Sequence, residues 1–74
     1  MEYKKRIVSD PDIMLGKPVV KGTKITVELI LRKMAEGMTI EEFLEAYPHL
    51  TKDDVLAAVS YSADVISREE LIAP

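Results

Sequence analysis

The residues of this sequence that could do chemistry are a single histidine and a short run of glutamates. His49 could move a proton or contact a phosphate, but a catalytic histidine needs a nucleophile or carboxylate held against it, and no motif specifies one. Glu41 and Glu45 stand four residues apart on an expected helix, and two carboxylates leave a hard cation undercoordinated. The chain has no cysteine for a disulfide or thiolate site. The sequence therefore predicts that the protein is not an enzyme and has no metal, cofactor or small-molecule substrate.

The charged residues divide the chain into two halves of opposite sign. Residues 1–33 carry eight basic side chains against four acidic ones, a net charge of +4, and residues 34–74 carry two against nine, a net of −7. In the basic half, Lys17, Lys21 and Lys24 surround an expected turn, where they could contact the phosphates of duplex DNA. Lysines on short edge strands also discourage aggregation, and both readings stay open.

The stretch "TKDD" opens the last expected helix. In a helix-turn-helix protein this end would face the major groove, so His49, Thr51 and Lys52 are predicted DNA contacts. Asp53 and Asp54 oppose that prediction, because carboxylates near phosphates weaken binding. An acidic residue can accept a hydrogen bond from cytosine, but the commoner role of these two is capping the helix, which needs no DNA.

Three repeated start signals predict a mainly α fold. "ITVELI", "MTIEEF" and "LTKDDV" each place a threonine cap after an apolar residue and an acidic residue in the first helical turn. Apolar residues then recur at helical spacing, and Gly37 and Pro48 end the first two helices. We expect one helix-turn-helix domain over residues 1–66, with helices at about 27–36, 40–47 and 52–66, and a C-terminal tail over 67–74.

Residues 1–25 differ in kind, because they predict short strands. "RIVSD" is one, and "GKPVVKGTKI" reads as two extended pieces around the turn that contains Gly22. Strands of about three residues are marginal alone, so we expect them to pair across a homodimer.

A second apolar face on the last helix also predicts a partner. One stripe of this helix, expected in the core, runs through Val55, Ala58, Val59, Ser62 and Ile66. A neighbouring face of the helix is also apolar, and a core of three helices does not bury both faces. The predicted dimer or partner residues are those of this face and two in the tail: Leu56, Ala57, Tyr61, Val65, Leu71 and Ile72.

The sequence gives no sign of a membrane protein. No apolar run approaches the about 20 residues of a membrane span, and no apolar signal core follows the basic residues of the N-terminus. We expect a cytoplasmic protein.

Four ordered motifs resemble a bacterial and archaeal family, the domain of unknown function numbered 433. They are Gly16-Lys17-Pro18, Gly22-Thr23-Lys24-Ile25-Thr26, Gly37-Met38-Thr39 and Tyr47-Pro48-His49-Leu50. The resemblance implies a strand-preceded helix-turn-helix domain, often dimeric and similar to the VapB class of antitoxins. It also implies a PIN-like ribonuclease toxin as partner and repression of a shared promoter.

Three functions follow as expectations. The first is an antitoxin-like protein of a type II toxin-antitoxin pair, which neutralises a PIN-like ribonuclease and binds operator DNA. The second is a stand-alone DNA-binding transcription regulator of the same fold. The third is a dimeric adaptor that binds no nucleic acid.

Overall fold

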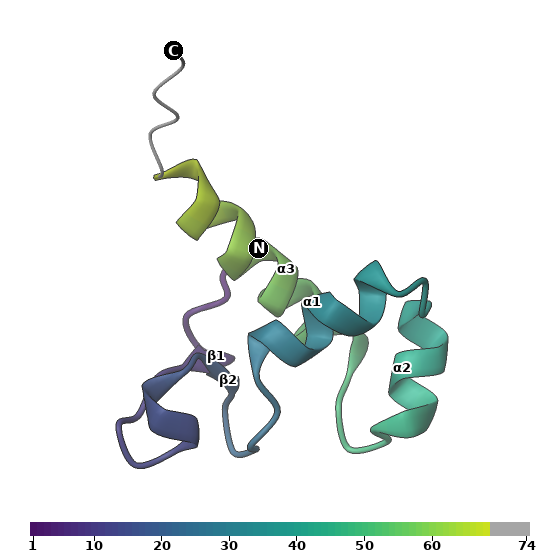
Figure 1. Ribbon diagram of the computed structural model, residues 1–74, viewed down its shortest axis with the longest axis horizontal. Coiled ribbons are helices and arrows are strands. Elements are labelled where there is room, and N and C mark those ends of the chain that lie inside the picture. The colour runs from purple at the N-terminus through teal and green to yellow at the C-terminus, as the bar shows by residue number, and fades with distance from the viewer. Residues whose placement is uncertain (69–74) are drawn as a thin grey trace.

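The computed structural model describes residues 1–68, which form three helices with a small sheet packed against them (Figure 1). The elements in chain order are β1 (Ile7–Val8), a short 3-10 helix η1 (Met14–Gly16), β2 (Val19–Val20), α1 (Val27–Ala35), α2 (Ile40–Ala46) and α3 (Lys52–Ser67). Each helix lies within one residue of its predicted bounds. The mainly α prediction with short N-terminal strands is confirmed.

Threonine caps start all three helices. The Thr26 hydroxyl accepts a hydrogen bond from Leu29 N at 3.0 Å. Thr39 and Thr51 each form a complete capping box, with Glu42 and with Asp54, in which the side chains of the pair satisfy one another's backbone N–H groups. Local sequence therefore decides where these helices begin.

The two strands pair with each other. β1 and β2 are antiparallel, with Ile7 opposite Val20 and Val8 opposite Val19. On its other side β2 is bound by the chain that returns after the turn, since Val20 N donates to Ile25 O at 2.9 Å. The two strands therefore pair within one chain, and the returning segment bonds the second edge of β2. Pairing of strands across a homodimer stays a prediction.

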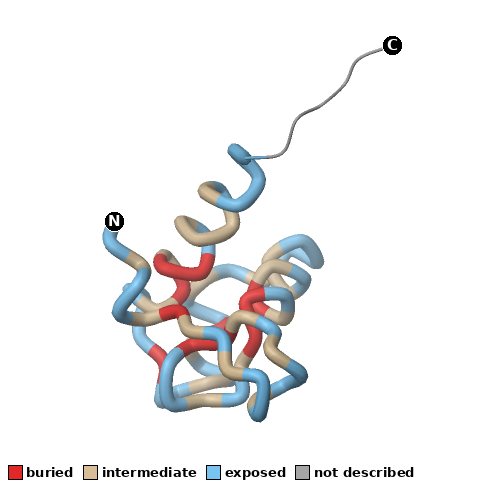
Figure 2. Tube along the Cα trace, turned by 90° about the vertical axis from the view of Figure 1, so that its left-hand side faces the viewer, coloured by how far each residue is buried: buried red, intermediate tan, exposed pale blue. Residues whose placement is uncertain are grey.

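The core lies where α1, α2, α3 and the sheet meet (Figure 2). Phe43, Ile30, Val19 and Val55 are its largest fully buried side chains. The ring of Phe43 stacks on Tyr47 with centroids 4.6 Å apart, so the end of α2 is fixed against the core. No helix within residues 1–68 is long and apolar enough to cross a membrane.

α3 departs from its predicted faces. Ala57 is 0% exposed, so its assignment to a partner surface is wrong: it belongs to the buried core cluster, which also contains Ile7 of β1. Val59 and Ile66, expected in the core, are 38% and 63% exposed. For Ile66 the cause is length, because α3 has 16 residues and α1 only 9, and the last turns of α3 run past the body (Figure 1).

Candidate functional site

The first candidate site is the edge formed by the start of α3 and the turn before it. Tyr47 ends α2, and the backbone of Leu50 donates to Tyr47 O at 3.0 Å across the turn. His49, Thr51 and Lys52 are all exposed there, so the structure brings together three of the predicted DNA contacts. The Thr51 hydroxyl is already occupied as a cap, because it accepts a hydrogen bond from Asp54 N at 3.2 Å.

Both carboxylates of "TKDD" have partners within the chain. Asp54 Oδ2 accepts from the backbone N–H of Thr51 at 2.9 Å, and Asp54 Oδ1 accepts from Arg6 Nη1 at 3.1 Å. Asp53 Oδ2 lies 3.7 Å from Arg6 Nη2. Capping by Asp54 and the ion pairs with Arg6 therefore account for both acids, and each oxygen of Asp54 already accepts one hydrogen bond.

Arg6 also joins this edge to the turn after β2. While its guanidinium contacts the start of α3, its main-chain oxygen accepts a hydrogen bond from Lys21 N at 2.7 Å. The basic turn and the start of α3 are thus neighbours on either side of one arginine.

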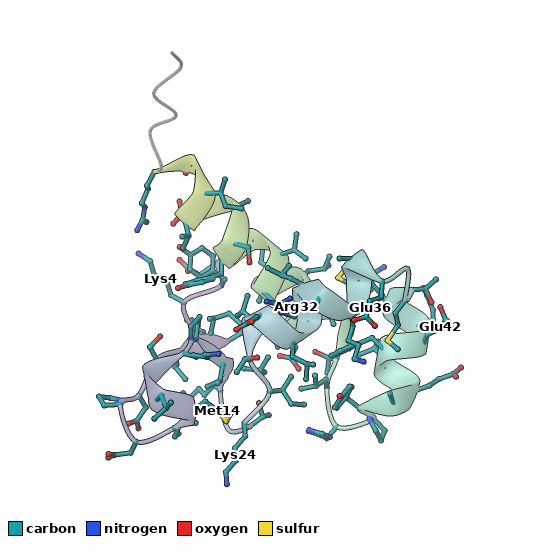
Figure 3. All side chains as sticks on the ribbon, viewed as in Figure 1. Lys4, Met14, Lys24, Arg32, Glu36 and Glu42 are labelled. Atoms are coloured by element: carbon teal, nitrogen blue, oxygen red, sulfur yellow. The ribbon has the colours of Figure 1, made fainter. Side chains whose placement is uncertain are left out.

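The turn after β2 is held by a single threonine. The hydroxyl of Thr23 donates to Val20 O at 2.7 Å and accepts from Ile25 N at 3.0 Å, and Gly22 takes a φ of 80° in the turn. Lys21 and Lys24 on either side are exposed, and Lys24 extends outward from the molecule (Figure 3). The structure therefore presents two of the predicted lysines freely to solvent.

Lys17 is in a different position. Its ammonium group lies 3.0 Å from Glu28 Oε1, and Glu28 Oε2 accepts from Arg32 Nε at 2.9 Å. These two cations, Lys17 first, hold the pKa of the Glu28 carboxyl below its ordinary value. Lys17 belongs to this charged triad rather than to the edge with Lys21.

An N-terminal arm, residues 1–6, runs along α3 and was not predicted. The hydroxyl of Tyr3 donates to Asp64 Oδ2, and its ring meets Tyr61 edge-on with centroids 5.5 Å apart. The hydrogen bond to Asp64 is the main reason why the pKa of Tyr3 is raised. The sequence held no signal for this contact, because the two residues are 61 positions apart.

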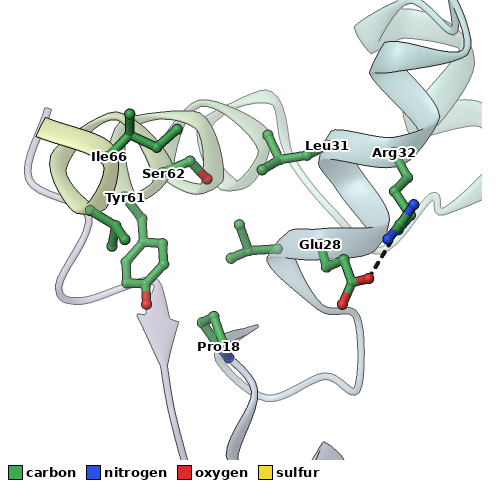
Figure 4. A pocket seen from close by; sticks show the side chains of 9 residues that line it. Pro18, Glu28, Leu31, Arg32, Tyr61, Ser62 and Ile66 are labelled. Atoms are coloured by element: carbon green, nitrogen blue, oxygen red, sulfur yellow. Dashed lines mark hydrogen bonds and ion pairs between the residues drawn. The ribbon is translucent and has the colours of Figure 1, made fainter. Parts of the chain in front are cut away.

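The second candidate site is an apolar groove between α1 and α3, with a volume of about 470 Å³ (Figure 4). Tyr61 and Val65, two predicted partner residues, line it together with Ile66. Leu56 is half-buried and lies outside the groove lining. The predicted partner residues Leu71 and Ile72 lie outside the described part of the chain.

The glutamates on α2 have a structural role. Glu42 accepts a hydrogen bond from Thr39 N at 2.9 Å, which lowers the pKa of its carboxyl. Within residues 1–68 no three of the histidine, aspartate and glutamate side chains gather as a metal site would require.

Comparison with known proteins identifies the family. The model of the family described as "Protein of unknown function (DUF433)" matches residues 7–62. An uncharacterised protein of Sinorhizobium fredii, y4eO, is 38% identical over 56 residues; these are 76% of this chain and only 25% of that protein.

A solved structure has the same fold. The crystal structure of a DUF433 member protein from Anabaena variabilis matches with a TM-score of 0.81 and 26% identity, over 88% of this chain and 64% of that one. The residues that the family model matches include β1, β2 and most of α3. The chain thus belongs to the DUF433 family.

Proposed function

We propose that this chain is an antitoxin-like protein that binds duplex DNA and neutralises a PIN-like ribonuclease. The observation that supports DNA binding is the position of Arg6. Its guanidinium partners the two carboxylates at the start of α3, and its main chain holds the turn that carries Lys21. The edge therefore offers exposed cations where the sequence alone suggested exposed anions.

The cations of this edge come from two separate elements. Lys21 and Lys24 lie on the turn after β2, and Lys52 lies in the first turn of α3, all exposed. The dipole of α3 adds partial positive charge at its first turn, beside these lysines. His49 stands on the preceding turn, where it would donate to a phosphate oxygen.

The support for a ribonuclease partner is electrostatic and comes from the sequence. A ribonuclease binds its polyanionic substrate in a basic channel, and residues 34–74 carry a net charge of −7. The family resemblance points to a PIN-like enzyme as the partner. Residues 67–74, which contain Glu69, Glu70, Leu71 and Ile72, are the segment that we propose to enter this channel.

Titration of duplex DNA at two salt concentrations tests the first half of the proposal. The probe is the DNA upstream of the protein's own gene, labelled for fluorescence anisotropy, at about 50 mM and about 200 mM salt. Lys21→Ala and Lys24→Ala are each expected to weaken binding and to lower the slope of log K against log salt by about 1. Lys33→Ala is the matched control, since Lys33 lies on α1 beside Glu36.

The result that would contradict DNA binding is specific. If Lys33→Ala weakens binding as much as Lys21→Ala, the contact is not at this edge. If no complex forms at either salt concentration, alone or with a partner, the adaptor without nucleic acid replaces the proposal. The groove between α1 and α3 is the feature that favours this second candidate.

Co-expression tests the second half. The full chain and a chain ending at residue 66 are each expressed with the product of the reading frame adjacent to the gene, which the proposal expects to be a small nuclease. We expect the full chain to co-purify with the nuclease and to inhibit RNA cleavage, and the shorter chain to lose both properties. Unchanged inhibition by the shorter chain would remove the tail from the proposal, and the absence of any complex would favour the stand-alone regulator.

A further inference from the structure

The groove between α1 and α3 exposes apolar side chains to water. Leu31 of α1 lines it from one side, and Tyr61 and Ile66 of α3 line it from the other (Figure 4). Ile66 is 63% exposed and Val65, also in the lining, is 37% exposed. Such apolar exposure on a small domain indicates a surface that is covered by something else.

The charged groups beside the groove are already paired. Glu28 accepts a hydrogen bond from Arg32 at 2.9 Å and lies 3.0 Å from the ammonium group of Lys17. The Ser62 hydroxyl donates to Ala58 O at 2.8 Å within its own helix. The groove therefore recognises an occupant by its apolar side chains, and not by its charge.

The N-terminal arm covers a different flank of α3. The Tyr3 hydroxyl donates to Asp64 Oδ2, and the Ser60 hydroxyl donates to Met1 O at 3.4 Å. Arg68 Nη2 also donates to Asp64 Oδ2, at 2.6 Å, so the end of α3 is held on the flank of the arm. Within residues 1–68 the flank that faces the groove stays open to the chain that follows Arg68.

The chain leaves α3 two residues after Ile66, beside the groove wall. The next four residues, outside the described part of the chain, are two glutamates followed by Leu71 and Ile72. Two extended residues span about 7 Å, which is close to the rise of four residues in a helix. A chain that turns back at the two glutamates therefore brings its leucine and isoleucine alongside the stretch of α3 from Ile66 to Ser62.

We propose that Leu71 and Ile72 fold back and occupy the groove of their own chain. In this arrangement Leu71 packs beside Ile66 and Ile72 reaches toward Tyr61, while the two glutamates remain in water at the turn. Burial of two branched apolar side chains against an apolar lining supplies the driving force.

Tethering favours this occupant over a separate molecule. A segment joined to its binding site by a short linker has an effective concentration on the order of millimolar. A second copy or another protein in micromolar solution is about a thousandfold more dilute. The chain's own leucine and isoleucine therefore fill the groove unless a competing partner binds about a thousandfold more tightly.

The docking also has a consequence for the ribonuclease partner, and this step alone rests on the proposed function. Residues 67–74 cannot enter the channel of an enzyme while Leu71 and Ile72 occupy the groove. If about nine-tenths of the chains are docked, the apparent affinity for the enzyme is about tenfold lower. Ile66→Ser weakens the docking, so we expect this variant to bind the nuclease more tightly by up to about tenfold.

Nuclear magnetic resonance of the full chain tests the docking directly. The leucine and isoleucine methyl groups are isotope-labelled, and Leu71→Ser and Ile72→Ser identify the signals of the two residues. We expect nuclear Overhauser contacts from these methyl groups to residues of the groove, with the ring of Tyr61 among them. The methyl groups of Leu15 are the control, because this residue is 95% exposed in η1 and does not line the groove.

A mixture of labelled and unlabelled chains distinguishes the possible occupants. Contacts that form within one chain at every protein concentration would support the proposal. Contacts found only between a labelled and an unlabelled chain would show that a second copy fills the groove, and the proposal would be wrong. The absence of any contact to the groove would equally reject it and leave the groove to a different protein.

Limited proteolysis gives a second measurement. Trypsin cuts after Arg68 when the chain on both sides of that bond is free to extend, so the rate follows the undocked fraction. We expect the double variant Leu71→Ser, Ile72→Ser to be cut there about tenfold faster than the natural chain. Leu15→Ser is the matched control and should keep the natural rate, and circular dichroism checks that each variant is folded. A double variant that is cut no faster would contradict the docking.

Neither measurement requires DNA or a nuclease. A docked tail in a chain that binds no nuclease would reject the proposed partner and keep this inference. A nuclease complex formed by a chain whose Leu71 and Ile72 never contact the groove would do the reverse.

Discussion

Arg6 and Asp54 are 48 residues apart in the chain, and the Arg6 guanidinium lies 3.1 Å from Asp54 Oδ1. The other oxygen of the same carboxylate caps α3 by accepting from Thr51 N. One side chain therefore both starts α3 and ties the N-terminal arm to it. Asp54 is the less exposed of the two partners, so water screens the pair only in part.

Replacing Arg6 tests this connection. Arg6→Ala leaves Asp53 and Asp54 without their cation, and we expect the free energy of unfolding to fall by about 1 kcal/mol. For a domain of this size the melting temperature would fall by about 4–8 °C. Thermal unfolding followed by circular dichroism measures the change. The control is Lys5→Ala, the same loss of charge on an exposed neighbour, and an equal effect there would contradict a specific role for Arg6.

Glu42 predicts a dependence of stability on acid. Its pKa is lowered in the folded chain because the carboxylate accepts the Thr39 backbone N–H. The stabilisation is therefore fully present above the ordinary pKa of a glutamate and is lost as the pH falls through the lowered value. Glu42→Gln retains an acceptor without the charge, so we expect it to be less stable than the natural chain at neutral pH.

Urea unfolding at pH 7 and at about pH 3 measures this difference. The gap between Glu42→Gln and the natural chain should narrow at the lower pH, because protonation removes the charge from Glu42. Glu41→Gln is the matched control, as Glu41 is an exposed neighbour in the same turn. A gap that stays constant with pH would show that the charge of Glu42 does not stabilise the cap.

The parts of this structure that local sequence encodes were predictable. Thr39 with Glu42, and Thr51 with Asp54, are signals within three residues, and the structure contains both boxes. The burial of Ala57 was not predictable in this way, because the buried cluster that contains it also includes Ile7, about 50 positions earlier. Helical periodicity identifies an apolar face, but the length of the neighbouring helix decides how much of that face is covered.

The same limit applies to the candidate sites. Lys21 and Lys24 could be proposed as exposed cations from the turn that surrounds them. The pairing of Arg6 with "TKDD" could not, since no spacing rule relates residue 6 to residues 53 and 54. This long-range pair is the contact that changes the electrostatics of the start of α3.

The Tyr3 hydroxyl predicts an alkaline transition in the N-terminal arm. Its pKa is raised above 10.0, chiefly because it donates a hydrogen bond to Asp64. The stabilisation is present below the ordinary pKa of tyrosine and is lost as the pH rises through the raised value. Tyr3→Phe keeps the ring against Tyr61 and removes the hydroxyl, so its stability should not show this loss.

Two measurements check the prediction for Tyr3. Ultraviolet titration should show a tyrosine ionisation with a pKa raised above 10.0, and this ionisation should be missing in Tyr3→Phe. Urea unfolding between about pH 9 and about pH 11 should show the natural chain losing stability relative to Tyr3→Phe. Tyr47→Phe is the control, and a similar change in that variant would show that the effect does not come from the arm.

Asp53 distinguishes the two possible roles of "TKDD" in the DNA binding that we propose. Its carboxylate is exposed and lies 3.7 Å from Arg6, a looser contact than that of Asp54. If its charge only opposes the phosphates, Asp53→Asn should tighten binding of any duplex by about threefold to tenfold at low salt. If it reads a cytosine amino group, the same change should weaken binding to the operator by about 1–3 kcal/mol and leave binding to other duplexes nearly unchanged.

The structure favours tighter binding by Asp53→Asn, because the ion pair with Arg6 and helix capping already explain why acidic residues stand at the start of α3. Titration of the natural chain and Asp53→Asn with the upstream DNA and with a shuffled duplex of the same length separates the two results, and selective loss on the upstream DNA would overturn this prediction.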